Sequence, residues 1–130
     1  MAPKRILVVE DNQVARSGLT EILCAEGYNA QSAATGGEAL SAALRLKPEC
    51  AIIDVALADV DGISLIQRMQ EQFPGCSCVV TSAWSDVWID RQGGAVGDHS
   101  EQAIEAGAVA FFRKPLNLDD LLDVLKRTLM

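Results

Sequence analysis

A chain of 130 residues, of which 49% are hydrophobic, is long enough to form one globular domain with its own core. The net charge of −7 argues against nucleic acid as a direct partner, because binding phosphates requires clustered Lys and Arg. No run of about 18 apolar residues is present, so the sequence predicts no membrane insertion.

In the first half of the chain, predicted strands alternate with predicted helices. Short runs rich in apolar residues predict three strands, over residues 5–10, 28–33 and 50–54. Apolar positions at helical spacing follow the first strand as far as Gly27, which is typical of a helix ended by glycine. A second helix is predicted to start at the capping box Thr35-Gly36-Gly37-Glu38 and to stop before Pro48.

The second half continues the same alternation. A third helix is predicted from Ile63 to Phe73, and two more strands over residues 76–82 and 109–112. Asn117 is expected to cap a final helix, whose leucines lie on one face. The stretch from Ala83 to Gly107 is the least regular, with a helix expected only from about Ser100 to Ala106.

Five strands alternating with helices predict an α/β domain over residues 1–130. The expected fold class is a flavodoxin-like, doubly wound, five-stranded parallel sheet in the order 2-1-3-4-5. This order makes the first and third strands neighbours, so the acidic residues at their carboxyl ends, Glu10, Asp11 and Asp54, should converge.

A cluster of three carboxylates needs a cation to neutralise it. Oxygen ligands from carboxylates suit Mg²⁺, which keeps part of its hydration and accepts phosphate oxygens. Lys114, at the end of the fifth strand, adds a positive charge to the same edge, and Ser82 or Thr81 adds a hydroxyl at the end of the fourth strand. Together these groups indicate transfer of a phosphoryl group onto Asp54.

Motifs spread from Lys4 to about Thr128 resemble the receiver domain of two-component response regulators. They are Ile6-Leu7-Val8-Val9-Glu10-Asp11-Asn12, the strand ending at Asp54 with Asp61-Gly62 beyond it, Ser82-Ala83, and Phe111-Phe112-Arg113-Lys114-Pro115. Each motif is weak alone, but their order and spacing together are specific.

The resemblance implies a phosphorelay function. Asp54 would be the phosphoacceptor, charged by a phosphohistidine on a histidine kinase or histidine phosphotransfer protein. Glu10 and Asp11 would bind Mg²⁺ with Asp54 and the backbone carbonyl of Ala56. The domain would be a cytoplasmic signalling phosphoprotein rather than an enzyme, although it would promote its own phosphorylation and dephosphorylation.

The resemblance also implies a conformational switch. Ser82, followed by Ala83, matches the switch hydroxyl better than Thr81, and Lys114 matches the lysine that contacts the phosphoryl group. The Lys114-Pro115 bond is typically cis in this family, and Phe111 stands at the position of the aromatic switch residue. Phosphorylation would remodel a surface for a downstream protein target, with the domain a monomer or a weak phosphorylation-dependent dimer.

Several positions depart from the family pattern. Ala58 replaces a usual proline, and Ala56 offers no polar side chain beside the phosphate. The interval from Ser82 to Lys114 is 32 residues, longer than usual, so we expect a fourth helix that is shortened, displaced or preceded by a long mobile loop. Trp84 and Trp88 in this stretch are expected to anchor the loop to the domain or to a partner.

Three other polar residues are interpreted without a role in the site. His99 is expected to be solvated rather than a metal ligand. Asp59 and Asp61 are expected to form turns rather than to bind metal. The four cysteines lack metal-finger spacing and are expected to be reduced, mostly buried thiols.

Alternative functions remain open at the level of sequence. A Mg²⁺-dependent phosphohydrolase could use Asp54 as nucleophile, but Ala56 stands where its general acid would be. A flavin carrier would need a glycine- and hydroxyl-rich loop after the first strand. A pseudo-receiver that takes no phosphate conflicts with the complete set of acids, Ser82 and Lys114. The chain is expected to be a stand-alone receiver, and a receiver cut from a longer regulator fits equally.

Overall fold

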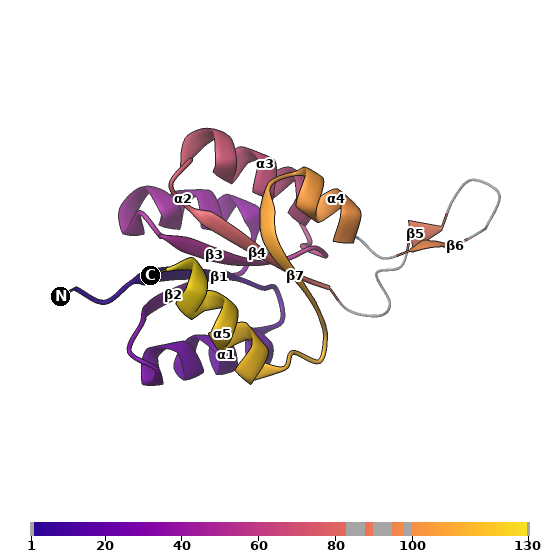
Figure 1. Ribbon diagram of the computed structural model, residues 1–130. Coiled ribbons are helices and arrows are strands. Elements are labelled where there is room, and N and C mark those ends of the chain that lie inside the picture. The colour runs from indigo at the N-terminus through magenta and orange to yellow at the C-terminus, as the bar shows by residue number, and fades with distance from the viewer. Residues whose placement is uncertain (1, 83–87, 90–94, 98–99, 130) are drawn as a thin grey trace.

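The computed structural model describes residues 2–82, 88–89, 95–97 and 100–129. Five parallel strands form one sheet in the order β2-β1-β3-β4-β7 (Figure 1). Their bounds are β1 Arg5–Val9, β2 Asn29–Ala33, β3 Cys50–Asp54, β4 Ser77–Ser82 and β7 Ala108–Arg113. Because β7 is the fifth strand of this sheet along the chain, the predicted order 2-1-3-4-5 is confirmed.

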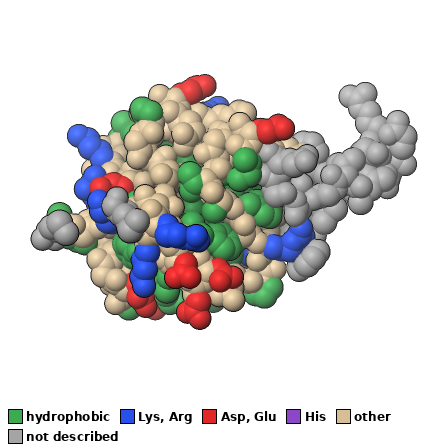
Figure 2. Space-filling view, in the orientation of Figure 1, with side chains coloured by type: hydrophobic (Ala, Val, Ile, Leu, Met, Phe, Trp, Pro, Cys, Tyr) green, Lys and Arg blue, Asp and Glu red, His purple; other side chains and the backbone are tan. Residues whose placement is uncertain are grey.

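Helices cover both faces of the sheet (Figure 1). One face carries α1 (Gln13–Ala25) and α5 (Leu118–Thr128), and the other carries α2 (Gly36–Leu46), α3 (Gly62–Gln72) and α4 (Ser100–Glu105). Acidic side chains gather over the N-terminal part of α5 (Figure 2), where Asp119 and Asp120 occupy the first turn. Negative charge there is favourable, because a helix N-terminus carries partial positive charge.

The central strand β3 shows why the sequence forms a two-sided core. All five of its residues are buried, as expected for a parallel strand covered on both faces. Ala51 and Ile53 pack in the cluster under α2 and α3, whereas Cys50 and Ile52 pack under α1 and α5. Successive side chains of a strand point to opposite faces, so this single strand contributes to both cores.

Polar side chains cap the helices that follow the strands. Thr35 accepts a hydrogen bond from Glu38 N at the start of α2, and Asn117 accepts one from Asp120 N at the start of α5, as the sequence predicted. Asn12 and Asp61 cap α1 and α3 in the same way. Gly27, with φ of 96°, follows the end of α1. These caps fix where each helix begins relative to the edge of the sheet.

The region between β4 and β7 differs from a regular alternation. The helix α4 has six residues, Ser100–Glu105, and Trp88–Ile89 (β5) pairs antiparallel with Ala95–Gly97 (β6). The predicted late and shortened fourth helix is confirmed, but the sequence did not predict the β5–β6 pair. The expectations for Trp84, for the Trp88 side chain and for His99 lie outside the described residues. No helix in the described ranges is long and apolar enough to span a membrane.

Candidate functional site

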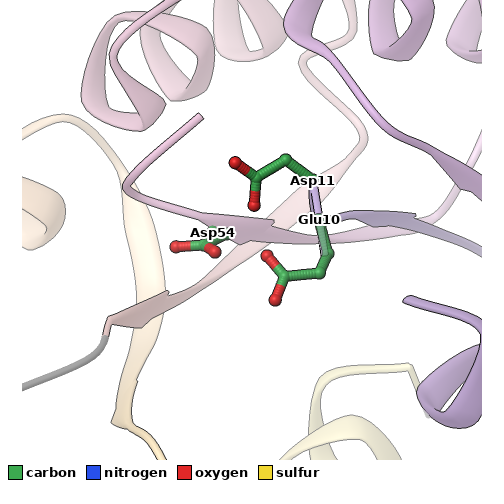
Figure 3. A group of neighbouring side chains, drawn as sticks. All are labelled: Glu10, Asp11 and Asp54. Atoms are coloured by element: carbon green, nitrogen blue, oxygen red, sulfur yellow. The ribbon is translucent and has the colours of Figure 1, made fainter. Parts of the chain in front are cut away.

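Three carboxylates meet at the carboxyl ends of two neighbouring strands. Glu10 and Asp11 directly follow β1, and Asp54 is the last residue of β3. The pairing of Val9 with Ile53 in the ladder brings Glu10 beside Asp54. One carboxylate oxygen from each residue lies within 4.8 Å of the other two, and the side chains turn toward a common space (Figure 3). The convergence expected from the strand order is therefore present.

Lys114 joins this cluster from the far edge of the sheet. Its Nζ lies 2.6 Å from Glu10 Oε1 and 3.0 Å from Asp54 Oδ2. The backbone N–H of Lys114 donates to Ser82 O at 2.7 Å, which extends the β4–β7 ladder to this position. The Lys114–Pro115 peptide bond is cis. One ammonium group thus bonds to two carboxylates, of Glu10 and Asp54, which are 6% and 5% exposed.

Burial and charge shift the pKa values of these groups. Burial is the largest cause that raises the pKa of Glu10 to about 7, helped by a hydrogen bond with Asp54 and opposed by Lys114. Burial lowers the pKa of Lys114, but its bonds to Glu10 and Asp54 outweigh burial and raise it above its ordinary value. The lysine therefore stays charged, whereas Glu10 titrates near neutrality.

The donor set fits a hard divalent cation. Glu10 Oε2 is buried and has no hydrogen-bond partner among the described residues, which is a costly state for an acceptor. Three carboxylates within reach of one another provide the oxygen ligands that Mg²⁺ prefers. A cation held by Glu10, Asp11 and Asp54 would satisfy that orphaned oxygen and would relieve the repulsion between the carboxylates.

The two candidate hydroxyls lie on opposite faces of β4. Thr81 lines a cavity of about 50 Å³ on the α1 and α5 side, together with Glu10 and Lys114. Ser82 is 1% exposed. It continues the alternation of Cys78 and Val80 along β4, so its side chain points to the face covered by α2, α3 and α4. Phe111 packs partly buried in that same cluster, paired with Val80 in the ladder. Ser82 and Phe111 therefore share one face of the sheet.

The loop between β3 and α3 is held close to Asp54. Asp54 Oδ1 accepts a hydrogen bond from Ala56 N at 3.0 Å, and Gly62 N donates to Val55 O at 3.0 Å. A Cβ atom on Gly62 would lie 2.5 Å from Val55 Cα and 2.6 Å from Asp54 O, so only glycine fits here. This close return of the chain places Ala56 directly beside the Asp54 carboxylate.

Asp59 and Asp61 were both expected to form turns rather than to bind metal, and their carboxylates accept hydrogen bonds from different segments. Asp61 Oδ1 accepts from Ile63 N and caps its own helix α3. Asp59 instead reaches another segment and accepts hydrogen bonds from Gly36 N at 2.8 Å and Gly37 N at 3.0 Å. The sequence did not predict this contact of Asp59, because a cap between segments depends on tertiary packing. The two consecutive glycines at the start of α2 are the signal in the sequence that matches this contact.

Comparisons with known proteins agree with this architecture. A profile of the response regulator receiver domain matches residues 6–126. Sporulation initiation phosphotransferase F of Bacillus subtilis (strain 168) is 27% identical over 129 residues, which cover 99% of this chain and 96% of that protein. Transcriptional regulatory protein PdtaR of Mycobacterium tuberculosis (strain CDC 1551 / Oshkosh) is 32% identical, over 95% of this chain and 56% of that protein. The chain thus spans nearly all of one relative and about half of another.

Solved structures show the same fold. A response regulator receiver domain protein (CheY-like) from Methanospirillum hungatei JF-1 superimposes with a TM-score of 0.82 at 30% identity, covering 98% of this chain and 94% of that chain. NtrX from Brucella abortus, crystallised with ATP, gives a TM-score of 0.81 at 29% identity and covers 99% of this chain, but only 27% of that chain is matched.

Proposed function

Since the chain belongs to the response regulator receiver domain family, we propose that it is a phosphorylatable receiver whose Asp54 accepts a phosphoryl group from a phosphohistidine, in a Mg²⁺-dependent reaction. The observation that supports this most directly is the cluster of Glu10, Asp11 and Asp54 with Lys114 bonded to two of its members. This arrangement combines a carboxylate nucleophile, a cation site and a movable positive charge.

The carboxylate of Asp54 is oriented for attack on phosphorus. Ala56 N holds Oδ1 at 3.0 Å, which leaves Oδ2, now paired with Lys114, as the oxygen free to react once the lysine shifts. An oxygen–phosphorus bond forms as the phosphorus–nitrogen bond of the phosphohistidine breaks, and the imidazole of the donor leaves with that electron pair. The product is an aspartyl phosphate on Asp54 and a histidine on the partner.

Charge neutralisation comes from the surrounding residues. Glu10, Asp11, Asp54 and the Ala56 carbonyl would hold Mg²⁺, which when bound would neutralise negative charge on the phosphoryl oxygens. Lys114 moves from Asp54 Oδ2 to a phosphoryl oxygen, and the Ser82 hydroxyl donates to another. Because Ser82 and Phe111 share one face of the sheet, the ring of Phe111 fills the space that Ser82 leaves.

Exposed apolar side chains on α4, β7 and α5 support a surface for a downstream protein target. Ile104 of α4 and Val109 of β7 are each 51% exposed, and Leu118 of α5 is 37% exposed. Exposed apolar side chains of this kind favour a protein partner, or a second copy in a weak phosphorylation-dependent dimer. The name of the Bacillus subtilis relative, a phosphotransferase of sporulation initiation, supports a place in a phosphorelay.

The remaining features concern location and chemistry. All four cysteines are free thiols, which suits the reducing conditions of the cytoplasm. The position two residues after Asp54 is the exposed Ala56, which cannot act as a general acid, so the phosphohydrolase alternative lacks a group that it requires. The proposal therefore treats residues 1–130 as one receiver domain that signals through its phosphorylation state.

Intact mass spectrometry after incubation with acetyl phosphate and Mg²⁺ tests the proposal. The expected result is a labile gain of one phosphoryl group, which is lost when Mg²⁺ is chelated before the donor is added. Asp54→Asn is the matched variant, because it keeps the shape of the side chain but removes the nucleophilic oxygen. A stable adduct, or an equal gain in the variant, would contradict the assignment of Asp54, and no adduct from acetyl phosphate or a phosphohistidine donor would favour a pseudo-receiver.

A further inference from the structure

Asp59 binds the start of a helix to which it does not belong. Its two carboxylate oxygens accept hydrogen bonds from Gly36 N at 2.8 Å and Gly37 N at 3.0 Å, more than 20 positions earlier in the chain. These hydrogen bonds hold the pKa of Asp59 below its ordinary value, and the bond from Gly36 has the largest effect. The side chain is therefore ionised at neutral pH, and its charge complements the positive end of α2.

The start of α2 would otherwise leave these two N–H groups without partners. Thr35 Oγ1 already accepts from Glu38 N at 3.1 Å, and the Glu38 carboxylate accepts from Ala34 N at 2.9 Å. Helix starts leave their first N–H groups without partners in the helix, and the local capping box satisfies only part of this set. The carboxylate of Asp59 accepts from the next two donors, Gly36 N and Gly37 N.

The residue after Asp59 packs against the same helix turn. A Cβ atom at Gly36 would collide with a methyl group of Val60, so the side chain of Val60 occupies the space that the glycine leaves open. Asp59 and Val60 together fix the middle of the β3–α3 loop to α2, one by hydrogen bonds and the other by close packing.

The ends of this loop carry the groups of the proposed site. Ala56 N donates to Asp54 Oδ1, Gly62 N donates to Val55 O, and Ala56 pairs with Asp61 in an isolated bridge. Between these contacts the side chain of Ala58 is exposed and that of Leu57 is only partly buried. The hydrogen bonds of Asp59 with α2 therefore attach the middle of the loop to the rest of the domain.

We propose that Asp59 is a positioning residue, whose carboxylate clamps the β3–α3 loop to α2 and thereby holds Ala56 and the Asp54 carboxylate in place for the cation and the phosphoryl group. This inference rests on the proposed function. It makes the N-terminus of α2 part of the support of the site, although α2 contributes no residue to the carboxylate cluster.

The test compares Asp59→Ala with Thr35→Ala. Both variants remove a cap from the same end of α2, but only Asp59→Ala releases the loop, so Thr35→Ala controls for loss of helix capping. Two quantities are measured: the Mg²⁺ dissociation constant by calorimetry, and hydrogen exchange of the Ala56 and Gly62 amides by NMR. Urea unfolding shows that both variants are folded and how much stability each has lost.

In Asp59→Ala, Mg²⁺ binding should weaken roughly tenfold, a typical effect of removing a partner that orients metal ligands. The Ala56 and Gly62 amides should exchange faster, whereas in Thr35→Ala both quantities should match the unmodified protein. Adding Ala58→Pro to Asp59→Ala should recover part of the Mg²⁺ affinity, because proline restricts the freed loop. Equal Mg²⁺ affinity and equal protection in the two single variants would overturn the proposal.

Failure of the proposed function has a different signature. If the unmodified protein neither binds Mg²⁺ nor accepts a phosphoryl group, the function proposed for Asp54 is wrong. Hydrogen exchange then tests only whether Asp59 holds the β3–α3 loop on α2. Unchanged protection of the Ala56 and Gly62 amides in Asp59→Ala would refute this contact's role, and lost protection would support it.

Discussion

Lys114 Nζ lies 2.6 Å from Glu10 Oε1, although 104 positions separate the two residues in the sequence. The contact joins the carboxyl end of β1 to that of the edge strand β7. The strands β3 and β4 lie between them in the sheet. Because the same ammonium group also reaches Asp54, its loss would leave two buried carboxylates facing each other. The charge balance of the site therefore depends strongly on the side chain of Lys114.

Lys114→Met should destabilise the metal-free protein by about 1–3 kcal/mol at neutral pH. The lysine side chain is 29% exposed, so the cost should stay below that of breaking a fully buried pair. Excess Mg²⁺ should recover much of the loss, since a cation can replace the missing charge. Urea unfolding with and without Mg²⁺ measures both effects.

Lys126→Met is the matched control for that experiment. Lys126 lies exposed in the last turn of α5, away from the carboxylates, and its replacement should change the free energy of unfolding by less than about 0.5 kcal/mol. Equal destabilisation by the two variants, or no response of Lys114→Met to Mg²⁺, would contradict the role given to the Lys114 ion pairs.

The raised pKa of Glu10 predicts an unusual dependence of stability on pH. In the metal-free protein this pKa rises from 4.5 to about 7, chiefly through burial. The folded state therefore binds more protons than the unfolded state between these values, and the free energy of unfolding should fall as pH rises through this window. This loss of stability is on the order of 3 kcal/mol and should be fully expressed above the folded pKa.

Urea unfolding in the presence of a chelator, from about pH 5 to about pH 8, measures this dependence, because the range brackets the shifted pKa. Glu10→Gln should remove the decline, since an amide does not titrate. Excess Mg²⁺ should also flatten it by holding Glu10 ionised. A decline of the same size in Glu10→Gln would assign the effect to another group.

The regular part of the fold follows from local sequence patterns. The apolar runs at β1, β3 and β4 and the caps Thr35 and Asn117 act through neighbours in the sequence, so their elements could be predicted within about two residues, the usual uncertainty of element ends. The strand order then brought Glu10, Asp11 and Asp54 together without further information.

What the sequence did not predict depends on contacts between distant segments. Asp59 has the local context of a turn, and only the packing of the β3–α3 loop on α2 makes it a cap for Gly36 and Gly37. The β5 and β6 strands have only two and three residues, which is too short for an alternating pattern that could identify them. The sequence likewise predicted that Lys114 adds a positive charge to this edge of the sheet, but not that it bonds to both Glu10 and Asp54.

Cysteine accessibility gives an independent test of the two-sided core. Cys24 is exposed on α1, whereas Cys50, Cys76 and Cys78 are buried, and burial raises the pKa of Cys50 to about 12. Iodoacetamide should modify Cys24 alone in the folded protein, because the thiolate is the reactive form and the other thiols are covered. Peptide mass spectrometry before and after urea unfolding identifies the modified residues. Rapid modification of Cys50 in the folded protein would be incompatible with β3 at the centre of the sheet.

Two glycine substitutions should have opposite effects, because their surroundings differ. Gly62→Ala would press a methyl group against Val55 Cα and Asp54 O, and backbone atoms cannot move aside without shifting Asp54. This variant should lose about 1–3 kcal/mol of stability and phosphorylate more slowly. Gly18 lies within α1 with nothing within 4 Å of the added atom, so Gly18→Ala should gain about 0.5–1 kcal/mol.

Urea unfolding and the initial rate of acetyl phosphate labelling, measured on both variants, separate strain at the site from general effects of adding a methyl group. Gly18→Ala should keep the labelling rate of the unmodified protein, because α1 gains stability without contact to Val55 or Asp54. If Gly62→Ala were as stable as the unmodified protein and labelled at the same rate, the tight return of the chain from Val55 to Gly62 could not be what holds Asp54 in position. The backbone approach at Gly62 therefore links a stability measurement directly to the geometry of Asp54, the proposed phosphoacceptor.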